Sequence, residues 1–232
     1  MTYLIVKKDF GPVPLHFQRA FLEMPHGGDS EYDLWENEKD CRIFNLHLGP
    51  PLWPKNIFKG RVIYVHRNAK DVVVSSYHHY KSQIAFPFNQ SFEEFVNRFI
   101  KGETFWGPFH KHLQDTDEMV KGGKPILLIS YEETKKNSKN TIRKIAAFLG
   151  ESLSDEMVDK IYEATTSENM KHNNDVNGAI WRSAGSWDSK EPFVRQAQVD
   201  GWVDSFKDDN LLKTFELYIN DKIPKSMQTE IS

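Results

Sequence analysis

The sequence contains only one cysteine, Cys41, among its 232 residues. A single cysteine excludes an internal disulfide and any metal site built from several cysteines, and it is typical of a reducing compartment. The sequence also lacks an excess of one charge, because its formal net charge is only −3. This balance argues against nucleic acid or a membrane as a partner bound by general electrostatics, so that any anion site must be local.

Long hydrophobic runs are missing as well. The N-terminal apolar run ends at Lys7 after four residues, which is too short for the core of a signal peptide or for a membrane span. We therefore expect a cytoplasmic protein. No internal repeat or low-complexity tract is present, and residues 1–232, with 39% hydrophobic and 13% aromatic residues, are expected to form a single α/β domain.

Three short aliphatic segments predict buried strands. Residues 61–65 and 126–130 are rich in Val, Ile and Leu and are bounded by turn or charge signals, and residues 42–48 form a third candidate. Each is followed by a helical pattern or by a loop leading to one. This alternation predicts a central parallel sheet covered by helices.

Helix signals separate these strands. Ser91 and Glu94 form a capping box before an apolar helical face, and Gly150 suits the end of a helix over residues 134–149. Further helices are predicted from Ser154 to about Thr165 and over residues 210–220. Residues 171–205 show no clear periodicity but hold three tryptophans, which is typical of a functional loop.

The turn after the strand at 61–65 is the strongest local sign of a ligand site. Ligands of open α/β sheets bind beyond the carboxyl ends of the strands, where Arg67 lies. We expect Asp71 to cap the next helix, and Ser75 follows one turn later, so that Arg67 and Ser75 could hold one phosphate. The spacing also allows the alternative that Arg67 pairs only with Asp71 and that Ser75 is merely solvated.

Five segments in the same order resemble the cytosolic sulfotransferases, which move a sulfuryl group from 3′-phosphoadenosine 5′-phosphosulfate (PAPS) to a hydroxyl or amine. YVHRNAKDVVVSSYHHY resembles the family's 3′-phosphate-binding segment, and LISYEET resembles the strand that carries an adenine-side tyrosine. The other three segments are RIFNLHLGPPLWP, TTSENMK and PFVRQAQVDGWVDSF, at residues 42–54, 165–171 and 192–206.

This resemblance implies a three-layer α/β/α fold with a central parallel sheet, of the kind that sulfotransferases share with P-loop NTPases. It also implies PAPS as the sulfuryl donor and a small phenol, steroid, alcohol or amine as the acceptor. His47 matches the family's general base, which takes the proton from the acceptor. The implied nucleotide-binding residues are Arg67, Ser75, Tyr131, Thr165, Arg195, Gln196 and Ala197.

The sequence departs from the family in several places. The glycine-rich loop that cradles the 5′-phosphosulfate has no counterpart, and residues 7–14 are the only glycine-bearing stretch early enough to replace it. Asn45 replaces a lysine, and Ser167 replaces a purine-stacking phenylalanine. In the segment at residues 192–206, which we call the late loop, Asp200 replaces a glycine. Gln196 and Ala197 themselves stand for a lysine and a glycine.

Two interpretations follow from the missing loop. The chain is either an N-terminally incomplete form of a working sulfotransferase or a diverged nucleotide-binding or interaction module. Residues 2–6 have strand-like composition and are expected to pair in the sheet in place of the family's interior strand.

No metal is expected, because the adjacent His78 and His79 would point to different sides of a helix. The family's dimer motif is not recognisable, so the sequence does not fix the oligomeric state.

Overall fold

The computed structural model describes residues 1–18, 38–39, 41–84, 88–188, 190 and 192–229. Within these residues the sheet has two parallel strands, β1 (Val62–His66) and β2 (Ile126–Ser130), which pair directly from Val62↔Ile126 to His66↔Ser130. The strands predicted at 61–65 and 126–130 are therefore confirmed to within one residue. The strand predicted at 42–48 is wrong, since this segment contains only a single bridge residue at Asn45.

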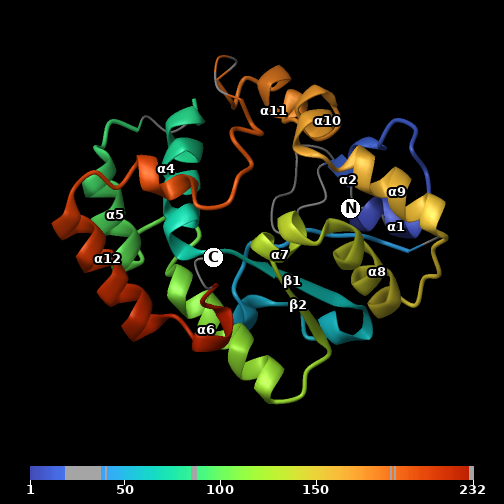
Figure 1. Cartoon of the computed structure of the whole chain (residues 1–232), viewed down its shortest axis with the longest axis horizontal. Helices are drawn as coiled ribbons and strands as arrows, with labels where there is room; N and C mark the ends of the chain where they lie inside the picture. Colours follow the sequence, from blue (N-terminus) through green and yellow to red (C-terminus); the bar gives the residue numbers. More distant parts are fainter. Residues whose placement is uncertain (19–37, 40, 85–87, 189, 191, 230–232) are drawn as a thin grey trace.

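The first group of helices covers one face of the sheet and forms the larger core (Figure 1). It comprises α4 (Ala69–Ser82), α5 (Phe92–Lys101), α6 (Phe109–Lys121) and α12 (Asp209–Lys222). Tyr64 of β1 and Leu128 of β2 face this group, as expected for alternate residues of a strand. The buried core includes Val73, Phe95, Phe99, Leu113 and Phe215.

The second group of helices covers the opposite face. It comprises α1 (Thr2–Lys7), α7 (Tyr131–Lys136), α8 (Ser138–Leu149) and α9 (Asp155–Ala164). Ile63, Leu127 and Ile129 of the strands belong to this side, where the buried core also holds Ile5, Ile142, Ile145, Val158 and Ile161. Helices on both faces of a parallel sheet give the three-layer α/β/α arrangement that the resemblance implied.

Residues 2–6 do not form a strand, which corrects the hypothesis that they pair in the sheet. They lie in α1, whose Ile5 is fully buried in the second core. Because β1 and β2 bond to each other directly, there is no gap between them for an added strand. A run of four apolar residues satisfies either secondary structure locally, and packing against α8 selects the helix.

The remaining helices are short. They are α2 (Leu15–Gln18), α10 (Ser167–His172) and α11 (Ala179–Ser183), with 3₁₀ turns at Pro50–Leu52, Ile57–Lys59, Gly201–Asp204 and Lys225–Met227. Residues 171–205, which show no clear periodicity in the sequence, are thus partly helical. It is tied to the end of α4, where the Asp188 amide donates to the Ser82 carbonyl at 2.9 Å and Gln83 bridges Trp187.

Local signals set most helix ends correctly. Ser91 and Glu94 form the predicted capping box of α5, and Gly150 ends α8 with a positive φ of 81°. The predicted helix over 134–149 is in fact two helices, α7 and α8, that meet at Asn137. None of the helices in the described part of the chain is long and apolar enough to cross a membrane.

Candidate nucleotide and acceptor site

Arg67 and Tyr131 meet at the carboxyl edge of the sheet. Each follows the last residue of its strand, and those last residues, His66 and Ser130, are paired in register. The two side chains are therefore brought together by the topology, with the Arg67 guanidinium 4.2 Å from the centre of the Tyr131 ring. This contact between a cation and an aromatic face joins two of the residues predicted to bind the nucleotide.

Asp71 has a different role from the predicted helix cap. The cap of α4 is Asn68, whose side chain accepts from the Lys70 amide at 2.9 Å. The carboxylate of Asp71 is buried, with 2% of its side chain exposed, and its Oδ2 lies 3.2 Å from an Arg67 guanidinium nitrogen. The pairing offered as the alternative to a phosphate site is therefore present, but it is part of a larger network.

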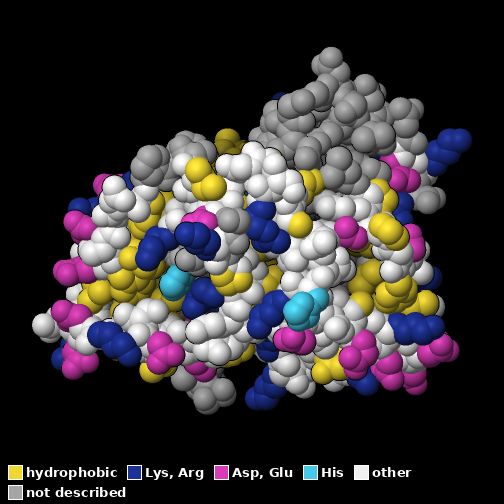
Figure 2. All heavy atoms as spheres, turned by 90° about the horizontal axis from the view of Figure 1, so that it is seen from above, with side chains coloured by type: hydrophobic (Ala, Val, Ile, Leu, Met, Phe, Trp, Pro, Cys, Tyr) yellow, Lys and Arg dark blue, Asp and Glu magenta, His cyan; other side chains and the backbone are white. Residues whose placement is uncertain are grey.

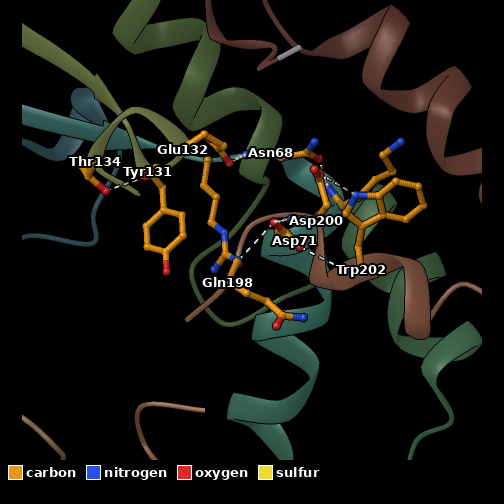
Figure 3. A network of polar contacts seen from close by, with 10 residues as sticks. Asn68, Asp71, Tyr131, Glu132, Thr134, Gln198, Asp200 and Trp202 are labelled. Carbon is orange, nitrogen blue, oxygen red and sulfur yellow. Dashed lines mark hydrogen bonds and ion pairs between the residues drawn. The ribbon is translucent and has the colours of Figure 1, made fainter. Parts of the chain in front are cut away.

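The late loop completes this network (Figure 3). Asp71 also accepts hydrogen bonds from the backbone amides of Asp200 and Trp202, both at 3.0 Å. Arg67 in turn donates to the Gln198 carbonyl at 2.8 Å. One buried carboxylate and one guanidinium thus hold the loop over residues 198–202 against the start of α4.

Two residues of the late loop adopt the left-handed conformation, Ala197 with a φ of 52° and Asp200 with a φ of 58°. These are the two positions where the resembling family has glycine, which takes this conformation at no steric cost. Asp tolerates it better than Ala does. We expect Ala197→Gly to raise the free energy of unfolding by about 0.5–1 kcal/mol, as measured by urea denaturation. A destabilised variant would contradict this reading of the loop.

The other predicted nucleotide-binding residues differ in burial and in the groups that they contact. Ser75 is exposed on α4, one turn after Asp71, and Gln196 is also exposed, whereas Arg195 is half-buried. The Thr165 hydroxyl donates to the Ile161 carbonyl at 2.8 Å at the end of α9. The contacts above therefore join Arg67 and Tyr131 to the late loop but do not by themselves bring Ser75 or Thr165 to the same point.

His47 lies in a second group of side chains. Its ring stacks on that of Trp106, with the ring centroids 4.4 Å apart and an interplanar angle of 16°. The segment that carries Trp106 is anchored to α4, because the Phe105 amide donates to the Tyr80 hydroxyl. His47 is thus held close to the C-terminal part of α4 by an aromatic neighbour.

Two further histidines adjoin His47. His79, on α4 beside Tyr80, contacts the Trp187 ring at 4.9 Å between centroids. Partial desolvation lowers the pKa of His79, and the neighbouring His47 lowers that pKa further. His112 bonds to the Tyr64 hydroxyl at 2.8 Å, and burial lowers its pKa as well. Imidazole and indole rings therefore lie next to the predicted base.

Residues 7–14, the early glycine-bearing stretch, follow α1 and form no strand-loop-helix unit. Lys7 pairs with Glu38 at 3.4 Å, and Lys8 pairs with Glu151 at 2.9 Å. As for metals, the residues that the structure describes contain no group of three or more His, Cys, Asp or Glu that could hold an ion.

Sequence reasoning missed several residues of the site. The sequence predicts Asp71 as a helix cap or as a partner of Arg67, but it does not predict the bonds of Asp71 to the late loop. It also does not indicate Trp106, His79 and Lys135 as neighbours of the predicted site residues. Lys135 had a usable signal, because it follows Tyr131 by four residues and would share its helix face. That signal was lost because the helix was predicted to begin at Thr134 instead of Tyr131.

Comparisons with known proteins identify the family. The family model described as "Sulfotransferase domain" matches residues 8–227. Sulfotransferase 1A1 from rat is 33% identical over 84% of this chain and 68% of the relative, and the mouse protein is 36% identical with the same coverage. Rabbit sulfotransferase 1C2 is 35% identical over 76% of this chain and 60% of the relative. The chain thus spans roughly two thirds of the length of these relatives.

Solved structures give the same result. Retinol dehydratase, crystallised with androsterone and the inactive cofactor PAP, superposes with a TM-score of 0.76 at 27% identity, over 87% of this chain and 59% of that chain. A mouse sulfotransferase complexed with PAP gives a TM-score of 0.73 at 27% identity, over 86% of this chain and 72% of that chain. The family match, the relatives and the fold together show that the chain belongs to the sulfotransferase family.

Proposed function

We propose that this chain transfers a sulfuryl group from PAPS to a hydroxyl or amine of a small acceptor. The observation that carries the proposal is the arrangement of Arg67, Tyr131 and Asp71 at the carboxyl edge of the sheet. Arg67 retains capacity for an anion, because its Nε is buried without a hydrogen-bond partner among the described residues. The residues present therefore fit a nucleotide phosphate.

The donor nucleotide would be held by its 3′-phosphate. In this proposal Arg67, Ser75 and Arg195 bind that phosphate, and Tyr131 and Thr165 lie on the adenosine side, with Gln196 and Ala197 in the late loop. PAPS supplies an activated sulfuryl group with adenosine 3′,5′-bisphosphate as its leaving group. Seen from above, several Lys and Arg side chains gather toward the middle of this face, where an anionic nucleotide would be attracted (Figure 2).

His47 is proposed as the general base for the acceptor. It would take the proton from the acceptor oxygen or nitrogen, which is a weak nucleophile until that proton is removed. Stacking on Trp106 fixes the plane of its ring. The aromatic rings on this side of the molecule suit a flat phenol or a steroid more than a charged acceptor. Trp106 stacks on His47, Trp187 contacts His79, and Phe193 lies 5.1 Å from Trp187.

A second candidate is a nucleotide-binding module without turnover. The pairing of Lys7 and Lys8 with carboxylates favours it, because neither lysine is then available to stabilise the leaving group. The two candidates share the nucleotide site and differ in chemistry. Incubation of chain 1–232 with labelled PAPS and a panel of phenols, steroids, alcohols and amines separates them: sulfated product supports the enzyme, and its absence with retained nucleotide binding supports the module.

The nucleotide site itself is tested by Arg67→Ala. We expect this change to weaken binding of adenosine 3′,5′-bisphosphate at least tenfold, about 1.4 kcal/mol, in calorimetric titration. Arg61→Ala is the matched control, because Arg61 is an exposed arginine just before the opposite end of β1. Equal affinities of wild type and Arg67→Ala, or an equal loss in Arg61→Ala, would contradict the proposed site.

A further inference from the structure

Tyr131 is in contact with two cations, Arg67 and Lys135. The Arg67 guanidinium is 4.2 Å from the centre of the Tyr131 ring, and the Lys135 ammonium is 5.6 Å from the same centre. Lys135 follows Tyr131 by one helical turn in α7, so that its side chain shares the same face. Three segments that are remote in sequence therefore meet here: the end of β1, α7 and the start of α10.

The start of α10 contributes Ser167, whose hydroxyl accepts from the Lys135 ammonium at 2.8 Å. A phenylalanine at this position would offer no such acceptor. The lysine is therefore held by a hydroxyl in place of an aromatic ring. Because a serine hydroxyl is neutral, this contact fixes the position of the ammonium without cancelling its charge.

Lys135 brings a second positive charge to Tyr131. Lys135 forms no ion pair with any carboxylate in the described part of the chain, although it is half-buried. Partial burial lowers the pKa of Lys135, and the charge of Arg67 lowers it further. Arg67 pairs with the buried carboxylate of Asp71. The charges of Asp71 and Glu132 both act on Tyr131. Lys135 nevertheless pairs with neither carboxylate, and Arg67 Nε is a buried donor without a partner among the described residues, so that both cations retain capacity for an added anion.

We propose that Lys135 is a further phosphate-binding residue, which holds the 3′-phosphate of the nucleotide together with Arg67 across the Tyr131 ring, with Ser167 positioning the lysine. This inference rests on the proposed function and adds a third cation to Arg67 and Arg195. Figure 3 shows the Tyr131 side chain extending away from the junction of β2 and α7. The phosphate would bind beside this ring, where it could accept hydrogen bonds from both Arg67 and Lys135.

The test compares two nucleotides that differ by the 3′-phosphate. Calorimetric titration of chain 1–232 with adenosine 3′,5′-bisphosphate and with adenosine 5′-monophosphate is repeated for Lys135→Ala. We expect the variant to weaken bisphosphate binding about tenfold and monophosphate binding less than twofold. Ser167→Ala should weaken bisphosphate binding about threefold, because the lysine loses its anchor. Lys135→Arg should recover most of the affinity, because it keeps the charge.

Lys136→Ala is the matched control, since Lys136 is the next residue of α7 and is exposed. Its bisphosphate affinity should stay within twofold of wild type. Equal losses for both nucleotides in Lys135→Ala, or a loss in Lys136→Ala as large as that in Lys135→Ala, would overturn the inference. If Arg67→Ala weakens bisphosphate binding and Lys135→Ala does not, the inference fails alone. If the folded wild-type chain binds no bisphosphate, the proposed function fails with it.

Discussion

Replacement of His47 by Ala is expected to lower the rate of sulfated product formation by 100-fold or more. General base catalysis by a positioned side chain contributes about 10²–10⁴-fold to a rate, and alanine removes the proton acceptor entirely. The loss should fall on the turnover number, because His47 is not among the residues proposed to bind the nucleotide. The measurement is steady-state turnover with labelled PAPS and the best acceptor of the panel, alongside the affinity for adenosine 3′,5′-bisphosphate.

The matched control for this experiment is His172→Ala. His172 is an exposed histidine at the end of α10 that pairs with Glu168 at 2.9 Å, so that its loss should leave turnover close to wild type. His47→Ala should bind the bisphosphate with an affinity within twofold of wild type. Turnover unchanged by His47→Ala would refute the assignment of the base. A large loss of nucleotide affinity would instead indicate that His47 supports the fold of the site.

Replacement of Asp71 by Asn is expected to lower the free energy of unfolding by about 3 kcal/mol. The Asp71 carboxylate is buried and accepts from two backbone amides and from Arg67. Asparagine has only one acceptor oxygen, and its NH₂ group would face a donor that the carboxylate now satisfies. The same change should weaken nucleotide binding, because Arg67 and the late loop lose their shared anchor. Urea denaturation and calorimetric titration measure the two effects.

Glu156→Gln is the matched control, because Glu156 also forms an ion pair one helical turn away, with Lys160 at 2.9 Å. That pair is exposed on α9, and exposed pairs contribute little to stability. We therefore expect the unfolding midpoint of Glu156→Gln to lie close to that of wild type. Similar midpoints for the two variants would mean that burial of the Asp71 carboxylate is not what holds the late loop.

The contrast between correct and incorrect strand predictions has a physical cause. The strands at 61–65 and 126–130 are aliphatic, bounded by turns and able to pair with each other. Residues 2–6 and 42–48 have similar composition, but β1 and β2 already bond directly, and residues 2–6 find a better place for Ile5 beneath α8. Whether a short apolar run becomes a strand depends on a neighbouring strand with which it can pair, and the residues of the run do not specify that neighbour.

The sequence by itself determined those features of this protein that depend on residues close together in the chain. The helix caps at Ser91 and Ser154 follow from side chains that bond their own first turn. The ends of two predicted strands indicate Arg67 and Tyr131, and five segments in order indicate the sulfotransferase family. These features depend on neighbouring residues or on the order of motifs. They can therefore be predicted without knowledge of the tertiary contacts.

Tertiary structure alone decided how these residues are used. The Asp71 carboxylate looks like a helix cap in the sequence, but its partners are the amides of Asp200 and Trp202, about 130 positions further along. The contact of Lys135 with Ser167 likewise joins separate helices. The role of a buried carboxylate, or of a lysine without an ion pair among the described residues, is set by the groups that folding places around it. Such contacts arise from the packing of the whole chain, and no short segment encodes them.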